Sequence, residues 1–404
     1  MNKTIFVAIL VASMALGAVA CSSDPTPTPS GPSLTSEDVQ AALSQALAAI
    51  PTPPPGVTAE EVEEIARRAA EQAASAGLTM AEVQQAIADA LAPKPPELEP
   101  IKLVSPTNSS FALSTNGAAD AGVFRKWGFD PVDRVFLPFP GFVAAFATRQ
   151  SEVGNYSGTT AIRRIASDGQ PWVIIGGGLT VMQNVYVPVD SPIQTVEDLR
   201  GKKLGVWSRT SGALEALRII WLEEYGIDLF DPNDIDLVVA APPVLFALAE
   251  QGEVDAQFQL SSLTVRAASR PDEWRELFSP NVWWQERTGQ PLVWAAPVVA
   301  WRDWVSEDVD RARRLVSALH ESFDWLAEPA NLRTAVAQYG ELAGVVDQAQ
   351  ADVYERWLGE GRIYLSKWDQ ETIDIQWEFL ELAQKHGVIE DIPPKGVAAR
   401  ALVE

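Results

Sequence analysis

Cysteine and histidine are almost absent from this chain of 404 residues, which contains one cysteine and two histidines. A single cysteine, Cys21, excludes an internal disulfide, and without a Cys/His cluster we expect no metal site, no haem and no other cofactor. His320 and His386 lie far apart on predicted helices. We expect surface or helix-end positions for both, so a zinc or haem enzyme is disfavoured.

An excess of positive charge is also missing, because 54 acidic residues face 31 basic ones and the net charge is −23. This balance argues against nucleic acid and against anionic membrane surfaces as partners. It leaves the charge of a small ligand open, since a local site can oppose the overall sign.

The N-terminal apolar run, from Ile5 to Ala20, is too short to span a membrane and has the length of an export signal. It ends in Leu16-Gly17-Ala18-Val19-Ala20-Cys21, which resembles a bacterial lipobox, although Ala18 stands where that pattern prefers leucine. The resemblance implies a signal peptide at 1–20 and lipidation of Cys21. The protein would then be an extracytoplasmic lipoprotein anchored to the cell membrane; simple signal cleavage is the alternative.

Aromatic residues are missing from 22–100, where proline, alanine and glutamate are abundant. Three repeats, at 34–39, 57–62 and 78–83, place a threonine three residues before an acid, with a hydrophobic residue on either side, which predicts three short capped helices. The second would carry a thin stripe through Val62, Ile65, Ala69 and Ala73. We expect residues 21–100 to form a proline-punctuated helical tether; helices that bind a partner or self-associate are the alternative.

From Ile101 onward the composition changes, because all fourteen tryptophans follow. Strand-like and helix-like segments alternate, which predicts an α/β protein with mostly parallel sheets. The expected strands are 101–104, 132–137, 152–156, 172–178, 183–188, 204–207, 235–240, 253–257 and 292–301. The expected helices include 112–127, 140–149, 213–225, 244–251, 307–326, 332–339, 348–358 and 370–385. We predict two hinged lobes, at 101–190 and 191–291, with 292–404 returning to the first lobe and adding C-terminal helices.

Residues 191–212 read as a short helix, a buried strand and the start of a second helix. Thr195 and Asp198 form a capping box, Gly201 ends the short helix, and the polar turn 208–212 opens the next one. A strand, a small polar turn and a helix direct backbone N–H groups and a positive helix end at a ligand, which suits an anion. An ordinary strand–helix connection is the alternative.

The segment 193–206 resembles a signature of periplasmic solute-binding proteins, in the group that serves sulfonate, nitrate and thiamine-precursor ABC importers. Two further stretches, 121–128 and 248–256, resemble motifs of the same group and follow in the same order. The resemblance implies a two-lobe type II binding-protein fold and an ABC permease in the cytoplasmic membrane as partner. It does not cover 22–100, and 151–155 departs from the group's pattern.

The strand-end loops that would face the cleft supply the candidate ligand-binding residues. Helix starts at 158–160 and 210–212 should face each other, Arg209 is a candidate contact for an anion, and Tyr156, Trp207 and Phe258 are candidates for stacking. For these rings, core packing is the alternative. The full set is Asn108, Ser109, Ser110, Phe111, Tyr156, Ser157, Gly158 and Thr159 from the first lobe, with Trp207, Arg209, Thr210, Ser211, Phe258 and Gln259 from the second.

We therefore expect a lipid-anchored substrate-binding protein that passes a small organic solute, such as a sulfonate, nitrate or a pyrimidine-like thiamine precursor, to an ABC importer. One alternative is an enzyme related to the pyrimidine synthases that share this fold. Those enzymes use His and Cys residues in the cleft, and no nucleophile–base pair can be assembled here, so we expect no enzyme. Another alternative is a surface sensor or adhesion protein that acts through its tether.

Overall fold

The computed structural model describes residues 35, 40, 41, 44, 59–76, 79–91, 98–107 and 109–403. The chain divides into two compact units, Met1–Pro95 and Pro96–Glu404. The predicted signal peptide, the lipobox with Cys21 and the candidate residue Asn108 lie outside the described residues.

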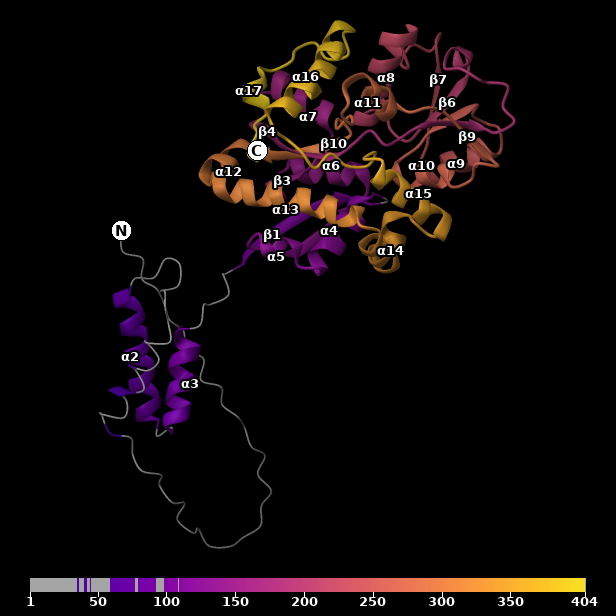
Figure 1. The fold of residues 1–404 in the computed structure, drawn as a ribbon. Coiled ribbons are helices and arrows are strands. Elements are labelled where there is room, and N and C mark those ends of the chain that lie inside the picture. The colour runs from indigo at the N-terminus through magenta and orange to yellow at the C-terminus, as the bar shows by residue number, and fades with distance from the viewer. Residues whose placement is uncertain are drawn as a thin grey trace. The chain divides into compact units, whose positions relative to one another are not determined.

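In the N-terminal unit, helices α2 (Ala59–Ser75) and α3 (Met80–Leu91) are in contact with each other (Figure 1). Their buried residues repeat every four positions, which places them along one face of each helix: Val62, Ala66 and Ala70 on α2, and Val83 and Ile87 on α3. The stripe expected on α2 is therefore corrected. It runs from Val62 through Ala66, whereas Ile65 is 37% exposed.

The third predicted capping box is confirmed. The backbone N–H and the hydroxyl of Thr79 both donate to Glu82 Oε2, each at 2.7 Å. These hydrogen bonds hold the pKa of Glu82 below its usual value. The boxes expected at 35–38 and 58–61 include residues outside the described part of the chain.

Among its described residues, the second unit contains ten strands in three sheets. The first lobe holds β1 paired with β2, and a three-stranded sheet in the order β3-β10-β4; the second lobe holds a five-stranded sheet in the order β7-β6-β8-β5-β9 (Figure 1). The strands are β1 (Glu99–Pro106), β2 (Phe129–Leu137), β3 (Val153–Asn155), β4 (Trp172–Leu179), β5 (Val185–Pro188), β6 (Lys203–Val206), β7 (Asp236–Val239), β8 (Ala256–Phe258), β9 (Trp274–Phe278) and β10 (Ala296–Trp301).

Two strands run against their neighbours, and both arrive from the opposite lobe. β5 is antiparallel to β8 and β9, and β10 is antiparallel to β3 and β4, whereas β6 is parallel to β7 and β8. β5 follows β4 through the crossover 180–184, and β10 brings the chain back. β5 already pairs in the five-stranded sheet of the second lobe, so the chain changes lobe before residue 190, where the sequence placed the boundary.

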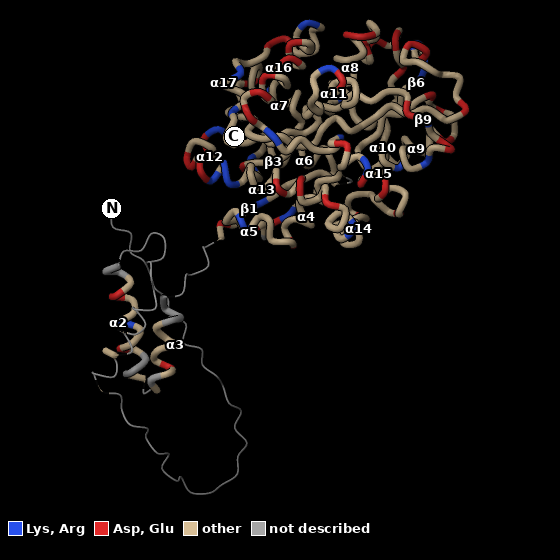
Figure 2. Tube along the Cα trace, in the orientation of Figure 1, with Lys and Arg blue, Asp and Glu red and all other residues tan. Residues whose placement is uncertain are grey.

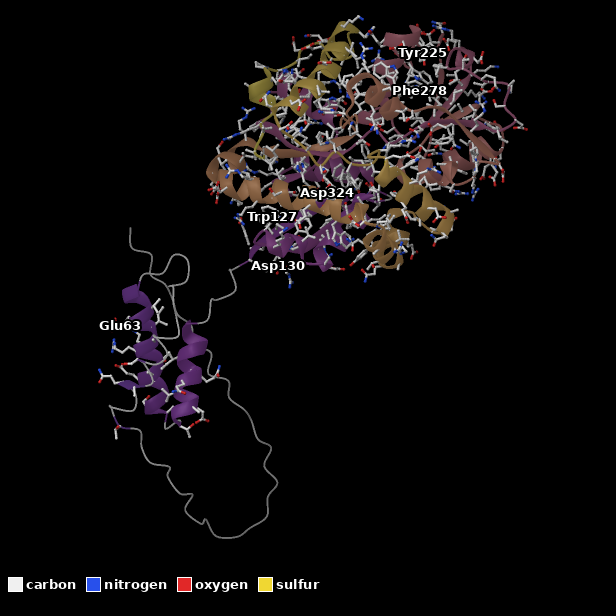
Figure 3. The ribbon with its side chains drawn as sticks, in the orientation of Figure 1. Glu63, Trp127, Asp130, Tyr225, Phe278 and Asp324 are labelled. Atoms are coloured by element: carbon white, nitrogen blue, oxygen red, sulfur yellow. The ribbon has the colours of Figure 1, made fainter. Side chains whose placement is uncertain are left out.

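Helices surround these sheets. They are α4 (Phe111–Asp120), α5 (Val123–Lys126), α6 (Phe139–Ala147), α7 (Gly158–Ser167), η1 (Glu197–Leu199), α8 (Gly212–Tyr225), α9 (Pro242–Glu250), α10 (Ser261–Ala268), α11 (Pro280–Thr288), α12 (Arg302–Glu307), α13 (Val309–Ala327), α14 (Pro329–Ala343), α15 (Gln348–Gly359), α16 (Gln370–Lys385) and α17 (Lys395–Ala398). At the end of α8, Tyr225 meets Phe278 of β9 edge to face, with ring centroids 6.1 Å apart (Figure 3).

One predicted helix is broken in two. The helix expected at 112–127 is interrupted at Gly122, whose φ of 81° lies in the left-handed region and separates α4 from α5. The helix expected at 307–326 is present as α13, which begins two residues later than expected. Asp308 separates α13 from the preceding α12 and caps α13 by accepting a hydrogen bond from the Arg311 N–H at 2.8 Å.

Three segments connect the two lobes: the crossover 180–184, the return at 291–295 and the later segment 360–368. Backbone hydrogen bonds from Thr180 N–H to Ile363 O, at 3.0 Å, and from Leu365 N–H to Gly178 O, at 2.9 Å, fix the later segment to β4. Asn281 of α11, in the second lobe, donates to the Arg362 carbonyl at 3.2 Å. The lobes are therefore joined at several places along one side.

Candidate functional site

The starts of α7 and α8 meet where the two lobes touch. Ser211 caps α8 by accepting a hydrogen bond from the Leu214 N–H at 3.2 Å. A Cβ atom on Gly212 would lie 2.7 Å from Ser157 Oγ and 3.3 Å from Thr159 Oγ1, both at the start of α7. The juxtaposition of two helix N-termini that the sequence predicts is therefore present.

Glycine makes this close approach possible on both sides. A Cβ atom on Gly212 would also lie 2.7 Å from the Trp294 carbonyl oxygen, and one on Gly158 would lie 2.6 Å from Cε3 of the Trp294 ring. The Gly158 N–H donates to that same carbonyl at 3.3 Å. The return segment thus fits against the first turns of both helices, with no room there for a larger residue.

A carboxylate of the protein itself lies at this junction. Glu215, in the first turn of α8, accepts a hydrogen bond from the Thr159 hydroxyl and forms an ion pair with Arg163 of α7, with Nη2 and Oε1 2.7 Å apart. The Glu215 side chain is 7% exposed and that of Arg163 is 40% exposed. Negative charge is favoured beside a helix N-terminus, so Glu215 occupies the place where α7 would receive an anion.

Two of the aromatic candidates lie in the core of the first lobe. The Tyr156 ring packs against Phe146 and Trp172, at centroid distances of 5.1 and 5.3 Å, and burial raises the pKa of its hydroxyl. The Phe111 ring lies 6.0 Å from that of Tyr364. For Tyr156 the packing alternative describes what the structure shows, and Phe111 is likewise buried in the core.

The other two aromatic candidates form a pair in the second lobe. Trp207 and Phe258 are stacked, with centroids 5.4 Å apart and an interplanar angle of 23°. Phe258 is buried, whereas Trp207 is partly exposed and its indole N–H has no hydrogen-bond partner among the described residues. Trp207 therefore carries a buried indole donor that has no partner among the described residues.

The remaining polar candidates divide into buried and exposed residues. Ser109 and Ser110 are buried at the start of α4, where Ser109 Oγ accepts from the Phe111 N–H at 3.4 Å. Arg209 and Thr210 are exposed. The Arg209 guanidinium lies over the Phe230 ring, 5.7 Å from its centroid, and the Thr210 hydroxyl lies 3.1 Å from that of Ser208.

Glutamines gather where β8 ends. Gln259 Nε2 donates to Gln257 Oε1 at 2.9 Å, and Gln183 Nε2 donates to Ser261 Oγ at 3.4 Å. All four residues are buried. The pairing of Val185 with Phe258 between β5 and β8 brings the crossover alongside the segment that opens α10. The sequence singled out only Gln259 of this set.

Each glutamine of this cluster keeps one polar atom without a partner among the described residues: Nε2 of Gln257, Oε1 of Gln259 and Oε1 of Gln183. Buried polar groups in proteins are almost always hydrogen-bonded, so such a group of atoms marks a place to look for a ligand. A signal for Gln257 was available in the sequence, because it interrupts the apolar run of a buried strand.

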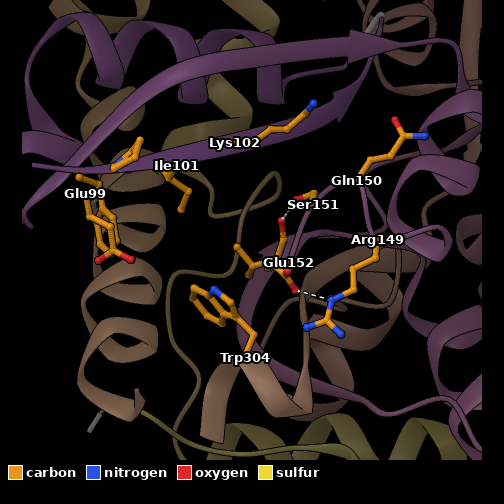
Figure 4. A pocket seen from close by; sticks show the side chains of 11 residues that line it. Glu99, Ile101, Lys102, Arg149, Gln150, Ser151, Glu152 and Trp304 are labelled. Carbon is orange, nitrogen blue, oxygen red and sulfur yellow. Dashed lines mark hydrogen bonds and ion pairs between the residues drawn. The ribbon is translucent and has the colours of Figure 1, made fainter. Parts of the chain in front are cut away.

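A separate pocket of about 180 Å³ opens on the first lobe, beside the beginnings of β1 and β3 (Figure 4). Charged residues that line it form ion pairs with other residues of the protein. Arg149 Nε lies 2.9 Å from Glu152 Oε2, and Lys102 Nζ lies 3.2 Å from Asp133 Oδ2. The strand ends that carry the candidate residues lie at the other end of β1 and β3, and no candidate lines this pocket.

His320 is not at the surface, which corrects the sequence expectation. It is buried within α13, where Nε2 accepts the Gly177 N–H at 3.1 Å, and burial lowers its pKa to about 4. His386 does lie at a helix end, just after α16, with Nε2 2.6 Å from Glu223 Oε2.

Within the described ranges, no group of three or more His, Cys, Asp or Glu side chains is placed to hold a metal ion. No helix in that part of the chain is both long enough and apolar enough to cross a membrane. Acidic and basic residues are scattered along the trace of the second unit (Figure 2).

We compared the chain with protein-family models and with solved structures. Residues 141–331 match the family model described as NMT1/THI5 like. The match spans just under half of the chain and includes α7, α8 and the glutamine cluster. It confirms the resemblance seen in the sequence to the binding proteins of ABC importers.

Solved structures show the same fold. The periplasmic sulfonate-binding protein from Methylobacillus flagellatus superposes with a TM-score of 0.54 at 19% identity, over 76% of this chain and 92% of that one. The aliphatic sulphonate-binding protein from Escherichia coli gives 0.57 at 17%, over 74% and 91%. The alkanesulfonate-binding protein from Xanthomonas axonopodis, bound to MOPS, gives 0.56 at 15%, over 76% and 99%. No curated protein matches the chain.

The chain therefore has the two-lobe α/β fold of periplasmic binding proteins, as the sequence predicts.

Proposed function

We propose that this protein binds a small organic solute between its two lobes and delivers it, chemically unchanged, to an ABC importer in the cytoplasmic membrane. The observation that carries the proposal is the meeting of two helix starts from different lobes, at Gly158 and Gly212, on the fold of periplasmic binding proteins. Sulfonates, nitrate and pyrimidine-like thiamine precursors are the solute classes that the sequence resemblance suggests.

The arrangement of the lobes supports capture by closure. Ligands of two-lobe proteins bind between the lobes, and the lobes move about the segments that join them. Here those segments lie together on one side, at 180–184, 291–295 and 360–368, while α7 and α8 touch. A solute that contacts both lobes stabilises the closed form over the open one, and the permease then recognises that closed form.

The proposal includes the cellular location of the protein. Lipidation of Cys21 would hold the protein on the outer side of the cytoplasmic membrane, and the tether 21–100 would let the second unit reach the permease. Support comes from the lipobox-like sequence and from the periplasmic binding proteins among the solved structures of this fold.

Calorimetry and X-ray scattering on the mature protein test solute binding. We expect one member of a panel of sulfonates, nitrate, pyrimidines and small carboxylates to bind, and its addition to make the particle more compact. Gly212→Val would place methyl groups against the Trp294 carbonyl and abolish this compaction. Gly359→Ala, at the end of α15 with open space around it, is the matched control and should compact normally. A panel without any binder, together with unchanged scattering, would refute the proposal.

The anchor has its own test. Wild-type protein expressed in a bacterial host should be recovered in the membrane fraction, with an N-terminal peptide that begins at a diacylated Cys21. Cys21→Ala should be found in the soluble fraction and bind solute equally well. Recovery of the wild type as a soluble protein with an unmodified Cys21 would refute the anchor and leave solute binding untouched.

A further inference from the structure

We propose that the solute carries no net charge and presents a hydrogen-bond donor beside an acceptor, as a lactam or a ureide does. This inference rests on the proposed function and narrows it to one chemical class. It follows from three features. The carboxylate of Glu215, from α8, lies beside the start of α7; a glutamine cluster lies at the end of β8; and the charged side chains around that cluster are already paired.

The first feature is that the anion-binding end of α7 is already occupied. The Thr159 hydroxyl, which would otherwise donate to a ligand, donates to the Glu215 carboxylate, and Arg163 neutralises that carboxylate at 2.7 Å. A sulfonate or nitrate brought to this point would find the Thr159 hydroxyl and the Arg163 guanidinium already bonded to a carboxylate of the protein. The junction therefore offers an incoming anion neither of these two donors.

The second feature is the hydrogen-bonding pattern of Gln257 and Gln259. Their mutual hydrogen bond uses one N–H group and one carbonyl oxygen, so the pair keeps one free amide donor and one free amide acceptor. This holds for either orientation of the two amides, because turning both over exchanges their roles and leaves one donor and one acceptor again. A ligand that satisfies both atoms must itself offer an acceptor beside a donor. A sulfonate or nitrate, which only accepts, would leave the carbonyl oxygen without a partner.

The third feature is that the charges around the cluster are already paired. Asn184, beside Gln183 on the crossover, donates to Glu276 Oε2 at 2.7 Å, and Arg362 lies 3.6 Å from the same oxygen. Arg209 is the only basic residue among the fourteen candidates, and it is exposed beside the Phe230 ring. The buried cluster therefore offers amide groups and no unpaired cation among the described residues.

A flat ligand body fits the same strand end. Phe258, between the two glutamines, stacks on Trp207, and the Trp207 indole N–H has no partner among the described residues. An aromatic face beside hydrogen-bonding groups suits a planar heterocycle. Small lactams and ureides combine planarity with the donor–acceptor edge.

The test is calorimetry on the mature protein, with uracil and hydantoin as neutral probes and methanesulfonate, taurine and nitrate as charged or zwitterionic ones. We expect a neutral probe to bind, with an affinity that stays constant between about 0.05 M and about 0.5 M NaCl, because screening acts on charged ligands. Gln259→Leu should weaken that binding by about tenfold to a hundredfold, the range for a lost buried hydrogen bond. Arg209→Gln should change it by less than about twofold.

Gln259→Glu is the second variant and keeps the shape of the side chain. Gln257 would then donate to the new carboxylate, which leaves two acceptors and no free donor, so the neutral probes should again lose affinity. If the wild-type protein instead bound a sulfonate or nitrate more tightly than the neutral probes, and if Arg209→Gln and added salt weakened that binding, this inference would be overturned. The proposed function would then still stand. No binding by any probe and no compaction in scattering would overturn both.

Discussion

Glu215 gives the sharpest prediction about how the lobes are held together. Glu215→Gln keeps the shape of the side chain and an oxygen that can accept from the Thr159 hydroxyl, but it removes the charge that faces Arg163. Breaking a fully buried ion pair costs about 3–5 kcal/mol. The Arg163 side chain is 40% exposed and regains water, so we expect a loss of about 1–2 kcal/mol in the free energy of unfolding.

Urea unfolding followed by tryptophan fluorescence measures this loss. The matched control is Glu224→Gln on the same helix, because Glu224 lies 3.8 Å from Arg287 in an exposed pair and should cost less than about 0.5 kcal/mol. A double-mutant cycle with Arg163→Gln should return a coupling energy of about 1 kcal/mol between the two residues. Equal effects of the two glutamate variants and a coupling energy near zero would show that Glu215 does not link the lobes.

Two further predictions concern the first lobe. The pKa of His320 in the folded protein is about 4, below the ordinary value of about 6.5. Between these two pH values the folded state binds fewer protons than the unfolded state. The contribution of His320 to stability is therefore full above pH 6.5 and is lost as the pH falls toward 4. Unfolding at pH 7 and pH 4 should show the wild type losing about 3 kcal/mol more than His320→Gln; equal losses would contradict the assignment. Gly177→Ala would bring a Cβ atom within 2.0 Å of the Leu365 carbonyl oxygen and should cost about 3 kcal/mol in urea unfolding, whereas Gly359→Ala should be neutral or slightly stabilising. A Gly177→Ala protein as stable as this control would mean that 360–368 does not pack on β4 as described.

The sequence predicted most of the helices and strands because their signals are local. Apolar periodicity, capping residues and left-handed glycines are read within a few positions, as at Gly201 and Ser211. Among the described elements that the sequence left out, β9 and α11 show the limit. β9 is an edge strand whose Arg275 and Glu276 break the apolar pattern, and the start of α11 was marked only by Ser279 followed by a proline.

The candidate site was predictable as a place and much less so as a set of side chains. In a two-lobe protein the strand-end loops of each lobe face the cleft, so the approach of α7 to α8 could be anticipated. Which way a ring points depends on contacts from distant segments: Tyr156 turned into an aromatic core that includes Trp172. Glu215 was missed because a lone acid in a helix carries no local sign that it is buried. Gln257 was missed although it interrupts the apolar run of a buried strand, because the sequence does not show that its amide lies beside that of Gln259.

The most direct test of solute binding without chemistry is native mass spectrometry of the protein isolated from its own host without refolding. The proposed function predicts a small non-covalent adduct that leaves on denaturation, rebinds to the emptied protein, and is recovered after long incubation with the same mass. Recovery of a product of different mass would contradict the central claim that this protein carries its solute unchanged.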